Sequence, residues 1–446
     1  MENTLQQSYH NRISHLIYEL NQRLIERDEL SRLVVLTMLS KQHMFLIGER
    51  GVAKSKTVEL VNGVIEGSIF WQLQINPKTK LEELFGEKRS GADGTIEYHS
   101  KRSVLNSHYV VLDEMFKGDN GLLNGLLEPL VDAAYTSGDG IKKEIPLLSV
   151  FGTSNEYPTE TFMLPYVDRF MVWYEVNRIQ DPEKRKQYYA GEYTKGKIAE
   201  HFFSLEDIET INKNIQSIIV PSYVIELFDA ITSTLIRQAV KTSDRKYERV
   251  LNTMIKTSAY LNNRIEVDIS DLFLLLHTAW HDEDEKDKVF RVVFEQIFGI
   301  QEALIGYLIW STKRIEEIDA YKNGNIFDYL HYKIDIEGND KNALFSKILG
   351  VINEVYNAYN EVKILLQNLK NKYNENLNIE KKLEENLFLY NYKQNAFTEE
   401  MMNNIQTIEA SLLQKIETLE IWYNQSGTLF DYQNCYTKKQ RGEKIA

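Results

Sequence analysis

The chain has 446 residues, of which 43% are hydrophobic, and its formal net charge is −13. This length allows two or three domains, the acidic balance argues against wholesale binding of nucleic acid, and no apolar run approaches the ~20 residues of a membrane-spanning helix. Residues 1–7 lack the apolar segment of a signal peptide, and the single cysteine, Cys435, excludes an intramolecular disulfide, so we expect a cytoplasmic protein.

Two helical patterns occupy residues 8–39, where apolar side chains recur three and four positions apart. An apolar run then predicts a buried strand over residues 44–47, and a glycine-containing turn follows it. Lys54 and Ser55 come next and open a further helical pattern. This order of strand, loop and helix is typical of a phosphate-binding loop (P-loop), whose backbone N–H groups surround the phosphates of a nucleotide.

In such a loop the lysine reaches the outer phosphates, the serine hydroxyl holds Mg²⁺, and the helix N-terminus adds partial positive charge. We therefore expect a nucleotide site that consists of Gly48, Glu49, Arg50, Gly51, Val52, Ala53, Lys54, Ser55 and Lys56. Ala53 stands where a second glycine is usual, and alanine permits close approach of the backbone if the residue needs no positive φ. A chance Gly/Lys/Ser turn before a helix is the alternative.

The segment Leu24-Ile25-Glu26-Arg27 separates the first two helical patterns, at the place where many P-loop ATPases close over the adenine. Its residues are generic, so the spacing alone supports this interpretation. We expect Ile25 to contact the base, and plain packing in the core is the alternative.

Residues 109–112 predict a second buried strand, which ends in the paired carboxylates of Asp113 and Glu114. This is the Walker B pattern: the first carboxylate joins the ligand sphere of Mg²⁺, and the second orients the attacking water. The alternative without a catalytic role is a strand that ends in a solvated acidic loop. The joint occurrence of both motifs, about 60 residues apart, argues against chance.

A third apolar strand leads to Asn155, which can hold the attacking water, although many strands end in Asn because it suits turns. Glycine-containing turns near residues 91–98 and 134–141 predict two hairpins, one before each of these last two strands. Residues 171–176 predict one more strand. We thus expect an α/β core that spans residues 1–220 and contains a doubly wound parallel sheet.

All seven prolines lie between Pro77 and Pro221, so the remaining residues can form long helices with few breaks. We expect a helical lid over residues 221–305 and a helical extension over 306–446, with a small irregular insert near 321–340. Apolar residues at heptad spacing between 348 and 373, and a second apolar pattern over 405–422, predict a long antiparallel helix pair. Since every motif precedes residue 250, we expect residues 341–446 to be separable from the core.

Together these motifs resemble the MoxR family of AAA+ ATPases and, within it, the RavA-like branch. The resemblance covers roughly residues 10–300. The matching segments are Gly48 to Ser55, Val111 to Lys117, Thr153-Ser154-Asn155-Glu156, Val167-Asp168-Arg169-Phe170 and Ser243-Asp244-Arg245. The compact β-rich module of RavA-like proteins is absent or vestigial here, since only residues 321–340 are available for it.

The resemblance implies ATP and Mg²⁺ as cofactors and a ring, usually of six subunits, with ATP bound between neighbours. It implies Lys54 on the phosphates, Ser55 and Asp113 at Mg²⁺, Glu114 as the water-orienting residue and Asn155 beside it. It further implies that Arg245 touches the nucleotide from the lid of the same subunit, and that Arg169 reaches the nucleotide of the next subunit. Each arginine has the alternative of an ordinary surface ion pair.

We therefore expect an ATP-hydrolysing remodelling motor of chaperone type that acts on a protein target. In this family the partner protein often carries a von Willebrand factor A (vWA) domain. An NTPase motor of a restriction or phage-defence complex is the alternative, with local basic residues such as Lys88, Arg89, Lys101 and Arg102 on a hairpin. A nucleotide-gated scaffold that hydrolyses slowly is a third possibility.

Overall fold

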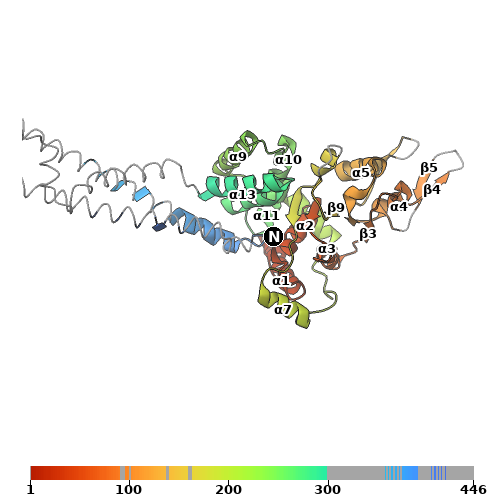
Figure 1. Cartoon of the computed structure of the whole chain (residues 1–446), viewed down its shortest axis with the longest axis horizontal. Coiled ribbons are helices and arrows are strands. Elements are labelled where there is room, and N and C mark those ends of the chain that lie inside the picture. Colours follow the sequence, from red (N-terminus) through yellow and green to blue (C-terminus); the bar gives the residue numbers. More distant parts are fainter. Residues whose placement is uncertain are drawn as a thin grey trace, which may run out of the picture. The chain divides into compact units, whose positions relative to one another are not determined.

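The computed structural model describes residues 2–90, 96–99, 102–136, 140–158, 163–298 and 374–389, with single helical positions between 357 and 371 and between 403 and 417. The chain divides into two compact units, one of Met1–Ile297 with Lys381–Lys393 and one of Phe298–Glu380 with Gln394–Ala446. The expected motifs all lie in the first unit, whose elements carry the labels used below (Figure 1).

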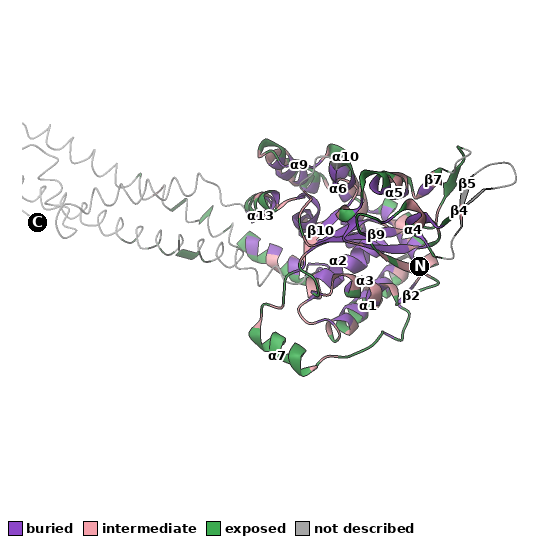
Figure 2. Cartoon of the chain, turned by 45° about the vertical axis from the view of Figure 1, so that its right-hand side comes forward, coloured by how far each residue is buried: buried purple, intermediate pink, exposed green. Residues whose placement is uncertain are grey.

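A five-stranded sheet forms the centre of the first unit, with strand order β10-β1-β9-β6-β3. Its strands are β1 (Met44–Ile47), β3 (Phe70–Gln74), β6 (Tyr109–Asp113), β9 (Ser149–Ser154) and β10 (Val172–Glu175). Every neighbouring pair is parallel, and β1, β9 and most of β6 are buried. Figure 2 shows the burial of β9. Burial on both faces explains why these strands read as continuous apolar runs in the sequence.

Helices pack on this sheet, and α3 contacts β6 and β9 while α2 contacts β10. The helices of this part are α1 (Glu2–Asn21), α2 (Asp28–Leu39), α3 (Lys54–Asn62), α4 (Leu81–Phe85), α5 (Asn120–Asp132), α6 (Leu164–Val167), α7 (Pro182–Ala190) and α8 (Leu205–Asn214), with short turns η1 (Val104–Asn106), η2 (Met115–Lys117) and η4 (Ile215–Ser217). A short parallel pair, β2 (Ile65–Glu66) with β11 (Phe203–Ser204), lies outside the main sheet. The expected parallel α/β core is confirmed.

A helical lid follows, and its helices are α9 (Ser222–Arg237), α10 (Asp244–Arg249), η5 (Val250–Ile255), α11 (Lys256–Leu261), η6 (Ile269–Leu274), α12 (Leu275–Thr278) and α13 (Glu283–Phe298). Its interior is apolar, with Leu272, Phe273, Leu274 and Leu275 all fully buried. In the part of the chain that the structure describes, no helix is both long and apolar enough to cross a membrane.

The two expected hairpins are present as antiparallel pairs, β4 (Glu87–Ser90) with β5 (Ile96–His99) and β7 (Ala134–Thr136) with β8 (Lys142–Glu144). Aromatic rings join them, because Tyr98 and Tyr135 each lie within 6 Å of Phe85 on α4 and within 5.9 Å of each other. The two hairpins therefore share one aromatic cluster, although residues 100–133 separate them in the sequence.

The expected insert near 321–340, the apolar heptad positions between 348 and 373 and those of the second helix over 405–422 lie outside the described residues. The domain ranges 1–220, 221–305 and 306–446 stay a prediction.

One segment from the last part of the chain belongs to the first unit. Residues 381–389, which we call the clasp, end a helix and then turn sharply. Leu383, Phe388 and Leu389 are at most 1% exposed. The clasp is therefore part of the core, and residues 341–446 are not separable from it as a block, contrary to the sequence-based expectation.

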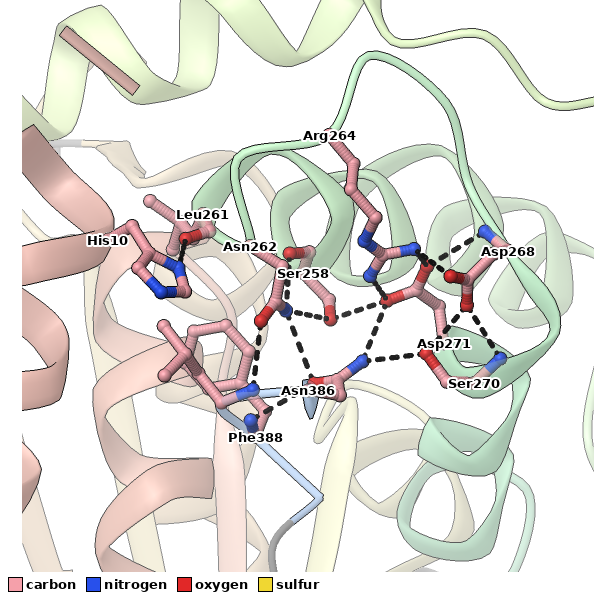
Figure 3. A network of polar contacts seen from close by, with 11 residues as sticks. His10, Ser258, Leu261, Asn262, Arg264, Asp268, Ser270, Asp271, Asn386 and Phe388 are labelled. Atoms are coloured by element: carbon pink, nitrogen blue, oxygen red, sulfur yellow. Dashed lines mark hydrogen bonds and ion pairs between the residues drawn. The ribbon is translucent and has the colours of Figure 1, made fainter. Parts of the chain in front are cut away.

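Polar contacts fix the clasp to the lid (Figure 3). The side-chain amide of Asn386 donates to Ser270 Oγ (3.1 Å) and Asp271 Oδ1 (3.2 Å) and accepts from Asn262 Nδ2 (3.2 Å). Asp271 is fully buried, and Arg264 compensates its charge through two hydrogen bonds of 2.7 Å. Because buried polar groups are costly without partners, this network specifies one position for the clasp.

We expect Phe388→Ala to lower the free energy of unfolding of the full chain by ~3–5 kcal/mol, because it removes a fully buried aromatic side chain. Leu377→Ala, at a position that is 43% exposed, is the matched control and should change stability by less than about 0.5 kcal/mol. Denaturant unfolding followed by fluorescence measures both. Equal unfolding midpoints for the two variants would show that the clasp is not part of the core.

Candidate nucleotide site

The candidate site begins where β1 ends. Gly48 follows the strand with φ of 150°, and a Cβ at this position would lie 2.3 Å from the carbonyl oxygen of Val176. Gly51 also has positive φ, at 82°. Close approach of the backbone therefore requires glycine at position 48, and the positive φ favours glycine at position 51. The loop leads into α3, whose N-terminus at Lys54 supplies free N–H groups and partial positive charge.

Ala53, the last residue before α3, lies in the left-handed region with φ of 70° and ψ of 26°. The condition stated above, that this alanine needs no positive φ, is therefore not met. A non-glycine residue in this region costs roughly 1–2 kcal/mol, because its Cβ crowds the following carbonyl oxygen. Ala53 therefore has a backbone conformation that is typical of glycine.

Lys54 lies against oxygen atoms of its own loop and of the neighbouring strand end. Its Nζ donates to the carbonyl oxygens of Gly48 and Glu49 (3.1 Å for the latter) and to Asn155 Oδ1 (3.3 Å). Partial burial lowers the pKa of Lys54, and the negative charges of Glu114 and Asp113 act in the opposite direction. Lys54 and Asn155, which are 101 residues apart in the sequence, thus lie in contact.

Asp113 is the centre of the candidate magnesium site. Ser55 Oγ donates to Asp113 Oδ1 at 2.7 Å, and Thr153 Oγ1 donates to the same oxygen at 3.0 Å. Gln72 Nε2 donates to the other carboxylate oxygen. Mg²⁺ is held in nucleotide sites by one or two protein oxygen ligands together with phosphates and water, so Ser55 and Asp113 fit this ion.

Sequence reasoning did not identify Thr153 and Gln72. Thr153 lies near the carboxyl end of β9 and Gln72 lies in the middle of β3, and both strands flank β6. For Thr153 the signal was present, because polar residues at the carboxyl ends of parallel strands meet at one edge of the sheet. Using it required the strand order, which the sequence does not state.

Glu114 is held in a strained and largely buried position. Its φ is 56°, it is 7% exposed, and its N–H donates to Thr153 Oγ1 at 3.3 Å. Its carboxylate pairs with Lys117 at 3.1 Å and with Arg50 at 3.7 Å. Non-glycine residues with left-handed backbone cluster at functional sites, which agrees with a catalytic carboxylate.

A cavity of about 490 Å³ lies beside the P-loop. Its lining includes Ile25, the loop residues Arg50 to Ala53, and residues of α7 and of the loop that follows it. The residues that line it are Arg23, Leu24, Ile25, Arg27, Arg50, Gly51, Val52, Ala53, Lys56, Leu60, Arg178, Ile179, Arg185, Tyr188, Tyr189, Tyr193, Thr194, Lys195 and Gly196. None of them is acidic, and the cavity is large enough for a nucleoside.

Three tyrosines of this wall were missed from the sequence. Tyr188 and Tyr193 stack on each other with ring centroids 5.7 Å apart, and Tyr189 is 77% exposed. No residue of α7 is buried, so the helix has no apolar stripe by which to predict it. The close spacing of three tyrosines was the available signal.

Arg169 and Arg245 lie at the opposite edge of the sheet from the P-loop. The register pairs Met44, the first residue of β1, with Val172, the first residue of β10, so Arg169 precedes the amino end of β10. Ser243, at the start of α10, donates to Asp168 at 3.2 Å. Among the described residues, neither arginine hydrogen-bonds to or pairs with the P-loop, Asp113 or Asn155. The role that the resemblance implies for Arg245, contact with the nucleotide of its own subunit, stays a prediction.

Comparisons with known proteins bear on the family and the fold. A family model described as the MoxR domain of MoxR-vWA-beta-propeller ternary systems matches residues 11–213, and an AAA lid domain matches residues 222–293. A crystal structure from Cytophaga hutchinsonii, of a protein assigned as an ATPase, superposes with a TM-score of 0.53 over 67% of this chain and 97% of the other, at 19% identity. That likeness supports the fold.

Three curated proteins are also similar in sequence to this chain. Two uncharacterized proteins of Methanocaldococcus jannaschii are similar to this chain. MJ0812 is 28% identical over 79% of this chain and 90% of its own length. MJ0079 is 31% identical over 62% of this chain and 72% of its own length. Chaperone MoxR1 of Mycobacterium tuberculosis is 25% identical over 39% of this chain and 46% of its own length. The RavA-like branch stays a prediction. The chain itself belongs to the MoxR family of AAA+ ATPases.

Proposed function

We propose that this protein is a Mg²⁺-dependent ATPase that works as a ring-shaped, chaperone-type remodelling motor in the cytoplasm. The single observation that carries the chemistry is the convergence of Lys54, Ser55, Asp113 and Asn155 at one edge of the sheet. A lysine and a hydroxyl at the start of a helix, beside a carboxylate at the end of a strand, suit a nucleoside triphosphate and its metal ion.

Each residue has a distinct part in this chemistry. Lys54 binds the outer phosphates, and Ser55 with Asp113 would hold Mg²⁺, which neutralises charge that develops on the phosphate oxygens. Glu114 orients and polarises the attacking water as its general base, and Asn155 holds that water from the other side. The aromatic cavity beside Ile25 takes the base, and tyrosine rings offer it a stacking surface.

The ring follows from the position of Arg169. A guanidinium at the amino edge of the sheet cannot serve the nucleotide at the carboxyl edge of its own subunit. A head-to-tail neighbour would bring the two edges together, and such heterologous contacts form a ring where the rotation between subunits closes. The family resemblance implies six subunits. Arg169 then stabilises transition-state charge on the neighbour's nucleotide.

The partner and target are proposed from the relatives. The family model that matches this chain is described for systems that pair a MoxR domain with a vWA protein, and one relative is named a chaperone. We propose that a vWA-domain protein presents a protein target to the ring. ATP turnover, measured with and without such a partner encoded nearby and with DNA as the alternative ligand, tests this part.

We expect Lys54→Ala to abolish ATP binding, because the phosphates lose their main point charge. We expect Glu114→Gln to keep the affinity for ATP and to reduce turnover at least a hundredfold, within the ~10²–10⁴ that a positioned base contributes. Titration with a fluorescent ATP analogue and a phosphate-release assay measure the two quantities. Wild-type turnover by Glu114→Gln would contradict the role of this carboxylate.

We expect Tyr188→Ala to raise the dissociation constant for ATP about tenfold, because stacking of an aromatic ring on a base contributes ~1–3 kcal/mol. Tyr188→Phe keeps the ring and should bind ATP like the wild type. Tyr18→Ala, at a position that is 60% exposed on α1, is the matched control. An unchanged affinity in Tyr188→Ala would place the base elsewhere.

We expect Arg169→Ala to bind ATP almost normally and to hydrolyse it ~10³-fold more slowly, since an arginine finger contributes ~10³–10⁵ in rate. Mixing it with Glu114→Gln subunits should restore turnover, because the intact arginine of one variant then faces the intact pocket of the other. Steady-state ATPase assays on mixed and separate subunits measure this. If the mixture hydrolyses no more ATP than its components, Arg169 does not act in trans.

A further inference from the structure

We propose that Lys117 is a positioning residue, which holds the Glu114 carboxylate in the orientation that directs the attacking water. This inference rests on the proposed function, in which Glu114 is the general base. Lys117 acts through this carboxylate and not on the nucleotide itself.

The carboxylate of Glu114 has a different cation beside each of its oxygens. Lys117 Nζ lies 3.1 Å from Oε2, and Arg50 Nε lies 3.7 Å from Oε1. Arg50 belongs to the P-loop, so Oε1 faces the side on which the phosphates of a nucleotide bind. The shorter contact therefore holds one oxygen and leaves the other directed toward the P-loop, where a general base must meet the water.

Burial distinguishes this contact from an ordinary surface ion pair. The side chain of Glu114 is 9% exposed, whereas that of Lys117 is 47% exposed. Pairs between two exposed side chains contribute little, but a buried carboxylate that loses its partner keeps an uncompensated charge. Without Lys117, the carboxylate would turn toward the cation that remains beside it, Arg50. Lys117 thus determines which way the carboxylate faces.

The backbone of Glu114 is fixed separately from its side chain. Thr153 Oγ1 accepts from the N–H of Glu114 at 3.3 Å and donates to Asp113 Oδ1 at 3.0 Å. One hydroxyl therefore sets the position of the Glu114 backbone relative to the candidate magnesium site. The orientation of the side chain is left to its own contacts, of which the ion pair with Lys117 is the shorter.

The turn η2 places Lys117 where it can make this contact. The N–H of Lys117 donates to the carbonyl oxygen of Glu114 at 2.9 Å. Met115 is fully buried, and the ring of Phe116 lies 4.9 Å from the ring of Phe45 on β1. Two apolar side chains thus anchor the turn, and Lys117 is its exposed residue.

The chain is also held directly after Lys117. A Cβ at Gly118 would lie 2.7 Å from Leu122 Cδ2 and 3.2 Å from Ile75 Cγ2, so the turn packs closely against both. Asp119 then caps α5 and accepts from the N–H of Leu122 at 2.8 Å. Because the turn is anchored on both sides, replacing the Lys117 side chain removes the ion pair and leaves the backbone in place.

The test compares full-length Lys117→Met and Lys117→Arg with the wild type. Lys117→Met removes the charge, and turnover should fall about 10- to 100-fold, since a misplacement of ~1 Å can cost ~10²-fold in rate. Its dissociation constant for a fluorescent ATP analogue should stay within about twofold of the wild-type value, because the P-loop is unchanged. Lys117→Arg keeps a cation for the carboxylate and should keep turnover within about threefold of the wild type.

A double variant separates positioning from a general structural role. If Lys117 acts through the carboxylate, adding Lys117→Met to Glu114→Gln should not slow hydrolysis further, because the two residues act as a unit. Single-turnover assays measure these slow variants. A further loss of about tenfold in the double variant would show that Lys117 acts elsewhere, and it would overturn the inference.

Lys142→Met is the matched control. Lys142 lies on β8, its side chain is 54% exposed, and it pairs with Asp132 at 2.7 Å. Both partners of this pair are exposed, so its loss should leave ATP turnover at the wild-type value.

Slow turnover by Lys117→Met at normal affinity, with recovery in Lys117→Arg, supports the inference. Wild-type or faster turnover by Lys117→Met, while Glu114→Gln is slow, overturns it and leaves the proposed function intact. Wild-type turnover by both Lys117→Met and Glu114→Gln overturns the role of Glu114 and this inference together. Equal losses in Lys117→Met and Lys117→Arg, or a loss of ATP affinity of about tenfold in Lys117→Met, also overturn it.

Discussion

The parallel order of the central sheet is the constraint on which the site depends. Because all five strands run in the same direction, their carboxyl ends meet at one edge, where Lys54, Asp113 and Asn155 come together. Arg169 precedes the amino end of β10 and therefore lies at the opposite edge of the sheet. One subunit therefore presents a nucleotide pocket on one side and arginines on the other, which is the arrangement that a head-to-tail ring requires.

Several elements join at the first turn of α2, beside the nucleoside cavity. Arg27, just before this helix, donates to the carbonyl oxygen of Val52 in the P-loop at 3.1 Å. Glu29 accepts from Tyr174 on β10 (3.1 Å) and lies 3.2 Å from His277 Nε2 in the lid. Arg32, one turn later, donates to the carbonyl oxygen of Leu387 in the clasp. One helix thus contacts the P-loop, the sheet, the lid and the clasp.

The sequence predicted the features that depend on neighbours along the chain. The P-loop, the Asp113-Glu114 pair and both hairpins could be located because strand, turn and helix signals are local. Features that depend on packing between distant parts of the chain could not be predicted. The backbone of Ala53, the partners Gln72 and Thr153, and the clasp all require strand order or tertiary contacts. The position of the lid is likewise fixed by tertiary contacts, those of Arg249 and Ser243.

Specific activity of the wild-type protein across a dilution series, with the assembly state measured in the same samples, tests the central claim most directly. If the catalytic site is divided between neighbours, turnover per subunit should fall steeply as rings dissociate. The affinity of single subunits for ATP should persist, because the P-loop and the cavity belong to one chain. Turnover per subunit that stays constant down to concentrations where only monomers are present would contradict the divided site.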